Sequence, residues 1–320
     1  MFRLIMTALA ASMALTPPTL AQTWPARPIR LVVPNAPGGP TDLVARVLAQ
    51  RMIESMGQQV IVENRIGAGG IVGTESVARA APDGYAVLVS AAGPMVITPH
   101  FHAGLPYDPL RDFVPVALGA TAPMILVTPP NGAKSLRELI AQAKARPGRL
   151  NYATAGVGTP PHLCAELLKS MAGIDVLHVP YKGTPQVEAA AMNGEVNFTF
   201  TQPTILTMAK AGRVRALAIS SAKRSSLAPD VPTLAESGLP GFEVTAWYGL
   251  FAPSRTPDEI VHRLNAEVMR ALRQPEVVER FKSLGFEAAA VHDEREFAAF
   301  VRRESVKWQK VVKEAGIKGE

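Results

Sequence analysis

Short runs of β-branched and aliphatic residues alternate with longer amphipathic segments along most of this chain. Ile29–Val33, Ala86–Val89 and Ala216–Ile219 are predicted to be buried strands, whereas Asp42–Met56 and Pro161–Met171 are predicted to be helices. Further predicted elements are the strands Val60–Val62, Val114–Leu118, Met124–Val127, Val176–Val179 and Val196–Phe200 and the helices Ser135–Ala145 and Pro185–Met192. This alternation predicts an α/β fold with parallel sheets and helices on both faces.

The first residues depart from this pattern and are typical of an export signal. Met1–Arg3 carries one positive charge, Leu4–Leu15 is apolar but too short to span a bilayer, and Thr19–Ala21 offers small residues for cleavage. We therefore expect residues 1–21 to be a signal peptide and the mature protein to be soluble and periplasmic. Cys164 is the only cysteine, so no cysteine at the cleavage site could carry a lipid.

The rest of the chain is long enough for two lobes. Pro123–Gly148 and Trp247–Pro275 share one pattern, a hydrophobic strand followed by a proline-containing turn and a long helix. A two-lobed binding protein needs two strands that cross between its lobes, and we assign Met124–Val127 and Trp247–Phe251 to that role. The alternative is two ordinary βα units in one continuous domain. The predicted lobes are residues 22–122 plus 249–320, and residues 123–248.

The segment "PNAPGGPTD" lies between a predicted strand and a predicted helix and suggests a ligand-binding loop. Gly38 and Gly39 lack a β-carbon, so a ligand can approach the backbone closely. Thr41 or Asp42 is expected to cap the helix. The remaining N–H groups of the first turn, with the helix dipole, favour an anion. A purely structural turn is the alternative.

A second segment, "NYATAGVGTPPHLCAELL", repeats this design in the other predicted lobe. A short strand leads to Thr154, Gly156 and Gly158, and Thr159 is expected to cap the helix that follows. Two glycine-lined helix N-termini that face each other would clamp a carboxylate. Closure of the lobes would exclude water and strengthen each charge-assisted hydrogen bond.

Other patterns favour neither a cofactor nor a metal. The glycines of Glu63–Gly73 are spaced one residue too far apart for a dinucleotide fingerprint, and no acidic residue follows at the right strand end. His162 and Glu166 share a helix face, and His100 and His102 are close in sequence, but neither pair has further ligands nearby. The net charge of +6 is scattered, which indicates a mild preference for anions and no nucleic-acid partner.

The sequence evidence for a catalytic residue is weak. Ser220 and Lys223 fit a Ser-x-x-Lys motif, but its companion motifs are missing. Cys164 lies on the apolar run of a predicted helix and is most simply a buried small side chain. A secreted hydrolase that uses His162, Cys164 or Ser220 is therefore the competing interpretation, and no catalytic residue is assigned.

The whole set of segments resembles the periplasmic solute-binding receptors of tripartite tricarboxylate transporters, the Bug-type receptors. The resemblance rests on "WPARPIRLVVP", "APGGPTD", "VENRIGAGG", "ARAAPDGY", "LPYDPLRDF", "NYATAGVGTPPHL", "HVPYKGTPQ", "SAKR", "PDVPTLAESGLPGFE" and "WYGLFAP". It implies the type II periplasmic-binding-protein fold, two α/β lobes joined by two crossing strands around a ligand cleft. It also implies a monomer without catalysis or cofactor that delivers a small carboxylate to membrane permease subunits. A receptor that feeds a sensor partner is the alternative.

The resemblance also implies which residues would bind the ligand, through backbone amides and ordered waters. The first loop would supply Asn35, Ala36, Pro37, Gly38, Gly39, Thr41 and Asp42, and the second loop Thr154, Gly156, Gly158, Thr159 and His162. Gly69, Ser90, Ala91 and Ala92 would form the floor of the site, and Tyr181, Lys182, Gly183 and Thr201 its far side.

Three positions depart from the family pattern. Asn35 stands where an aromatic residue is frequent, and Thr154 replaces a frequent serine but keeps the hydroxyl. Asn197 and Thr201 stand where acidic residues are common. The loss of two negative charges would make the cleft more tolerant of a second carboxylate or of a neutral tail.

Overall fold

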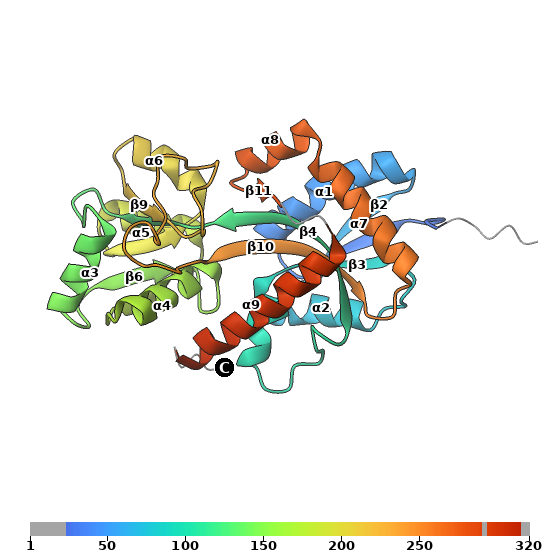
Figure 1. The fold of residues 1–320 in the computed structure, drawn as a ribbon, viewed down its shortest axis with the longest axis horizontal. Coiled ribbons are helices and arrows are strands. Elements are labelled where there is room, and N and C mark those ends of the chain that lie inside the picture. Colours follow the sequence, from blue (N-terminus) through green and yellow to red (C-terminus); the bar gives the residue numbers. More distant parts are fainter. Residues whose placement is uncertain (1–23, 290–292, 315–320) are drawn as a thin grey trace, which may run out of the picture.

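The computed structural model describes residues 24–289 and 293–314 (Figure 1). The predicted signal peptide and its cleavage site lie outside the described residues. Strands and helices form two groups side by side, and the long strands β4 and β10 run between them (Figure 1). The group that contains the six-stranded sheet is called the first lobe below, and the group that contains the five-stranded sheet is called the second lobe.

The sheet of the first lobe has the strand order β11-β4-β10-β3-β1-β2. Its strands are β1 (Ile29–Val33), β2 (Val60–Asn64), β3 (Ala86–Ala91), β4 (Phe113–Pro123), β10 (Thr245–Pro253) and β11 (Glu287–Ala288). β1 pairs in parallel with β2 and β3, whereas β10 is antiparallel to both β3 and β4. The expectation of parallel pairing therefore holds for β1, β2 and β3 but is wrong for β10, which enters this sheet from the second lobe in the opposite direction.

The sheet of the second lobe has the order β7-β6-β8-β5-β9. Its strands are β5 (Ile125–Thr128), β6 (Asn151–Thr154), β7 (Leu177–Pro180), β8 (Phe198–Thr201) and β9 (Arg215–Ile219). β6 is parallel to β7 and β8, whereas β5 is antiparallel to β8 and β9. The carboxyl ends of β6, β7 and β8 therefore meet at one edge of this sheet.

The connection between the lobes differs in one respect from the prediction. The outgoing strand is β4, which continues to Pro123 and pairs with β10 as far as Thr245. Ile125 already pairs with β8 and β9 in the second sheet, so the assignment of Met124–Val127 as the crossing strand is wrong. The predicted return segment Trp247–Phe251 lies within β10. The small residues that extend β4 carry little hydrophobic signal, which explains the misplacement.

Helices cover both sheets. They are α1 (Pro40–Met56), α2 (Ile71–Ala78), α3 (Leu136–Ala145), α4 (Pro160–Ala172), α5 (Thr184–Asn193), α6 (Leu206–Lys210), α7 (Asp258–Leu272), α8 (Pro275–Ser283) and α9 (Glu294–Glu314). Short helical turns span Ala68–Gly70, Gly93–Ile97, Thr98–His100 and Pro203–Ile205. Helix α9 extends from the first lobe to α4 in the second (Figure 1). No helix within the described ranges is both long and apolar enough to cross a membrane.

One large hydrophobic core runs through both lobes. Aromatic rings connect its parts, since Phe200 of β8 stacks on Phe242 and Trp247 of β10 packs edge-on against Phe297 of α9. A smaller core, which includes Val127 of β5, fills the space between the second sheet and α5. The shared core holds the carboxyl ends of the strands, and the loops that follow them, in fixed positions.

Candidate ligand-binding loops

The first glycine loop is held by its own polar side chains. The Asn64 amide donates to the carbonyl of Asn35 at 3.0 Å and to Asp42 Oδ1 at 2.9 Å. Asp42 Oδ2 accepts from the N–H of Gly38 and from Arg46 Nε, both at 2.8 Å. The Asp42 carboxylate is almost completely buried. These contacts fix the shape of the loop from the inside.

The predicted helix cap on this loop is wrong. Gly39 is the N-cap of α1, and no side chain caps the helix there. The Asp42 carboxylate reaches back to Gly38 instead, and Pro40 opens the helix. The backbone N–H groups of Thr41 and Asp42 donate to no group among the described residues, as is usual in the first turn of a helix. These two N–H groups are therefore unused donors.

The charge of Asp42 is neutralised locally. Burial alone would raise the pKa of this carboxyl, but hydrogen bonds from Arg46, Gly38 and Asn64 outweigh burial and hold its pKa below the usual value. Asp42 is therefore an ionised carboxylate paired with a guanidinium at neutral pH. It supports the loop and would not repel a bound anion as an isolated charge would.

The second glycine loop also uses its side chains internally. Thr154 Oγ1 lies 2.6 Å from His178 Nε2 and accepts from the N–H of Gly156 at 3.2 Å. Thr159 is the N-cap residue of α4 as predicted, but its hydroxyl donates to the carbonyl of Gly156 at 2.7 Å and makes no cap bond. The prediction of a side-chain cap is wrong here too. The N–H of Gly158 points to His162 Nδ1 at 3.4 Å.

Glycine is required in this loop by the backbone. Gly156 has φ 133° and Gly158 has φ 75°, values that residues with a β-carbon rarely adopt. The ring tip of Phe101, in the first lobe, lies 3.9 Å from where a β-carbon on Gly158 would stand. The second loop therefore lies against the first lobe at Phe101.

A buried polar cluster behind the second loop was missed by the sequence analysis. The Tyr152 hydroxyl donates to Glu166 Oε1 at 2.5 Å, and Lys169 Nζ lies 2.8 Å from the same oxygen. The rings of His162 and His178 lie 4.8 Å apart, and His178 stacks on Tyr152 at 5.0 Å. The spacing of His162 and Glu166 on one helix face indicates that their side chains lie close together, but in the sequence this spacing suggests only a candidate metal site. Within the described ranges no three acidic, histidine or cysteine side chains gather as a metal site requires.

Burial sets the protonation of this cluster. It lowers the pKa of His162 to about 4, although the nearby Glu166 carboxylate acts in the opposite direction. The pKa of His178 is also lowered, first by burial. His162 is therefore neutral at pH 7. Because its Nδ1 accepts from Gly158, its proton is on Nε2, which makes no hydrogen bond among the described residues.

Other predicted residues gather at the same sheet edges. Gly69 follows β2, while Ser90, Ala91 and Ala92 lie at the end of β3. A β-carbon on Gly70 would lie 3.0 Å from Pro94 Cγ and 3.5 Å from Pro34 Cβ, so the loops after β1, β2 and β3 touch. The Ser90 hydroxyl is buried and has no described partner.

In the second lobe, the N–H of Tyr181 donates to the carbonyl of Thr154 at 2.8 Å, which joins the loop after β7 to the second glycine loop. Lys182 and Gly183 continue this loop to α5. The Thr201 hydroxyl donates to Glu188 Oε1 at 2.7 Å, so it is already engaged. Two cavities, of about 580 and 230 Å³, lie elsewhere, and none of the predicted binding residues lines either of them.

Two α/β lobes joined by paired crossing strands, with glycine loops at the carboxyl edges of their sheets, define a periplasmic-binding-type solute receptor. The model of the tripartite tricarboxylate transporter family receptor matches residues 44–317, and the chain belongs to this family. Protein BugT of Bordetella pertussis is 39% identical over 311 residues, which cover 96% of this chain and 95% of BugT.

Solved structures agree with this assignment. Rpa4515 of R. palustris with adipate is 35% identical, with a TM-score of 0.80, 92% of this chain covered and 99% of that chain. MatC of Rhodopseudomonas palustris with bound malate is 38% identical, with a TM-score of 0.76, 90% of this chain covered and 100% of that chain. The predicted fold class and family are therefore confirmed.

Proposed function

We propose that this receptor binds a small organic carboxylate between its lobes and delivers it to the membrane permease subunits of a tripartite tricarboxylate transporter. The observation that carries the proposal is the pair of glycine loops, one per lobe, each between a strand end and a helix N-terminus. Adipate and malate, which appear in the related structures, are both dicarboxylates, so a dicarboxylate is the first candidate.

The proposed binding mode follows from the groups that the loops leave unused. The side chains of Asp42, Thr154 and Thr159 are each hydrogen-bonded to a backbone group of their own loop. Backbone N–H groups at the start of α1 and the Nε2 proton of His162 are then the donors that would hold a carboxylate. Donors of this kind supply directional hydrogen bonds and a helix dipole without a full positive charge.

The proposed lobes are residues 22–122 plus 249–320, and residues 123–248. Ligand would close them around the β4–β10 pair, as two-lobed proteins do around hinge strands. We further propose an exported, soluble monomer without enzymatic activity. A receptor that feeds a sensor would use the same loops, and no observation favours it over transport.

The competing hydrolase hypothesis finds no support in the candidate nucleophiles. Cys164 is completely buried, and burial raises the pKa of its thiol. The Ser220 hydroxyl donates to the carbonyl of Val244 at 2.5 Å and accepts from the N–H of Met124 at 2.8 Å. Ser220 joins structural elements, and neither Ser220 nor Cys164 is exposed to a substrate.

The test is a calorimetric titration of the mature protein with mono-, di- and tricarboxylates, amino acids and aromatic acids. A binding carboxylate at a hundred times Kd should also stabilise the protein by about 2.7 kcal/mol in thermal unfolding. Gly39→Val should weaken binding, and the exposed helix substitution Ala141→Val is its control. If no carboxylate bound to folded protein, or if Gly39→Val kept full affinity, the proposed site would be wrong.

A further inference from the structure

Strand β9 ends the five-stranded sheet, and only part of its outer edge is covered. The N–H of Ile219 donates to the carbonyl of Pro232 at 2.8 Å, and the carbonyl of Ile219 accepts from Leu234 at 3.0 Å. This short segment runs parallel to β9 and bridges only at Thr233. On that side, the backbone from Arg215 to Leu217 bonds to no other described segment. An open strand edge is a template for another strand.

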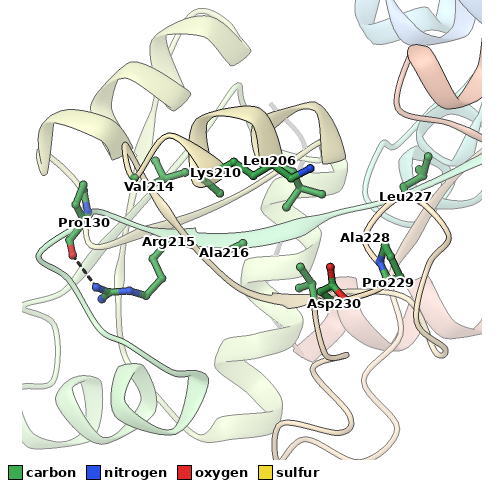
Figure 2. A pocket seen from close by; sticks show the side chains of 13 residues that line it. Pro130, Leu206, Lys210, Val214, Arg215, Ala216, Leu227, Ala228, Pro229 and Asp230 are labelled. Carbon is green, nitrogen blue, oxygen red and sulfur yellow. Dashed lines mark hydrogen bonds between the residues drawn. The ribbon is translucent and has the colours of Figure 1, made fainter.

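Arg215 and Ala216 of this uncovered edge line the larger cavity, which is about 580 Å³ in volume (Figure 2). Val214, Arg215 and Ala216 line the floor, α6 forms one wall, and residues 227–231 form the other. The walls are mostly apolar: they include Leu206 and Ala209 on α6 and Leu227, Ala228, Pro229 and Val231 opposite. A groove with a strand edge as floor and a helix as wall has the geometry of sites that bind extended peptides.

Three charged side chains line the groove, and they differ in whether they already have partners. The Arg215 guanidinium donates to the carbonyls of Pro130 at 2.9 Å and Gly132 at 3.0 Å, which anchors it. Lys210 and Asp230 are exposed and make no ion pair within the described ranges. Lys210 is thus a cation available to an acidic side chain.

We propose that this groove binds an extended peptide segment of a protein partner, which pairs with the open edge of β9 as a further strand. The part of the edge that lines the groove, Arg215 and Ala216, is two residues long, roughly 7 Å at the usual rise of a strand, so the segment is short. The peptide segment carries small apolar side chains, which pack against the apolar walls, and one acidic residue, which pairs with Lys210. None of the groove residues belongs to the glycine loops, so this site is separate from the proposed carboxylate site.

The probe is the peptide acetyl-Thr-Val-Glu-Val-Thr-amide, titrated into the ¹⁵N-labelled mature protein and followed by NMR. We expect amide shifts confined to β9, α6 and residues 227–231. Lys210→Glu should weaken binding roughly 1.5- to 5-fold, the size of an exposed ion-pair effect. A peptide with Lys in place of Glu should recover the affinity for this variant. Lys223→Glu, an exposed reversal outside the groove, is the control and should leave affinity unchanged.

A peptide N-methylated at both valines separates strand pairing from simple pocket filling, because it keeps the side chains and loses backbone donors. We expect it not to bind. Equal binding of the methylated peptide, or no shift at millimolar peptide, would overturn the proposal. So would sedimentation that shows a dimer whose formation depends on Lys210, since the edge would then be occupied by a second copy of the chain.

Discussion

The buried histidine of the second loop should make the stability of this protein depend on pH in a defined window. His162 is only 5% exposed, and burial lowers its pKa from 6.5 to about 4. In the unfolded chain the ring titrates near its ordinary value. Between these two values the unfolded state binds a proton that the folded state does not. Stability is therefore lost as the pH falls through this window and is unaffected by this group above it.

The size of the effect follows from the shift. One pKa unit corresponds to about 1.4 kcal/mol, so at pH 4.5 this group should cost about 2.5 kcal/mol of unfolding free energy relative to pH 8. His162→Asn removes the titration, and its amide oxygen can still accept from Gly158. We expect the variant to be less stable at pH 8, because the ring is lost, but to lose about 2.5 kcal/mol less on acidification.

Urea unfolding followed by fluorescence at pH 8, 7, 6, 5 and 4.5 would measure this difference. Other titrating groups contribute to both proteins and largely cancel in the comparison. His162→Gln is a companion variant, since it also lacks a titrating ring but places its amide differently. If both variants kept the wild-type dependence on pH, His162 would not be held neutral by burial, and the picture of a closed polar cluster would fail.

Three further results are expected. Glu287→Ala should lower the unfolding free energy by about 1–3 kcal/mol in urea titrations, because Glu287 Oε1 accepts from the Ser225 hydroxyl at 2.7 Å and joins β11 to the second lobe; unchanged stability would show that this contact is not maintained in solution. Cys164→Ala should cost about 1 kcal/mol and leave ligand affinity intact, and the native thiol should react with a disulfide reagent only on unfolding; fast labelling of folded protein would contradict this. Gly39→Val and Thr154→Ala should each weaken carboxylate binding in calorimetry, and together less than additively if both loops meet the ligand only on closure; strict additivity would indicate a preformed site.

Local sequence patterns predicted the strands and helices well where a hydrophobic run is followed directly by proline or glycine. β1 ends at Val33, where Pro34 follows a β-branched run, and its predicted bounds match the structure. β4 was predicted to end at Leu118 but continues to Pro123. Its last residues are small and carry no periodic signal, and only pairing with β10 makes them a strand. Strand direction also depends on long-range pairing, which explains why the antiparallel strands β5 and β10 were not predicted.

The loops of the candidate site were placed by glycine and proline, but the directions of their side chains were not predictable. A threonine or aspartate near a helix start commonly caps it, yet the Thr159 hydroxyl bonds to Gly156 and the Asp42 carboxylate to Gly38. The contact between Tyr152 and Glu166 joins a strand to a helix. Its geometry is set by the packing of α4 on the sheet, which no local pattern encodes.

These internal hydrogen bonds would keep the backbone N–H groups of both loops in fixed positions before a ligand binds. A glycine loop without internal bonds would lose much conformational entropy on binding. Here Asp42 and Asn64 hold one loop, and Thr154 and His178 hold the other, before any ligand arrives. The Asp42 charge is paired with Arg46, and His162 is neutral at pH 7, so neither of these two side chains would place an unpaired charge beside the proposed ligand. In the proposed binding mode, recognition of the carboxylate would depend on backbone N–H groups and on His162, which substitutions of exposed side chains elsewhere leave unchanged.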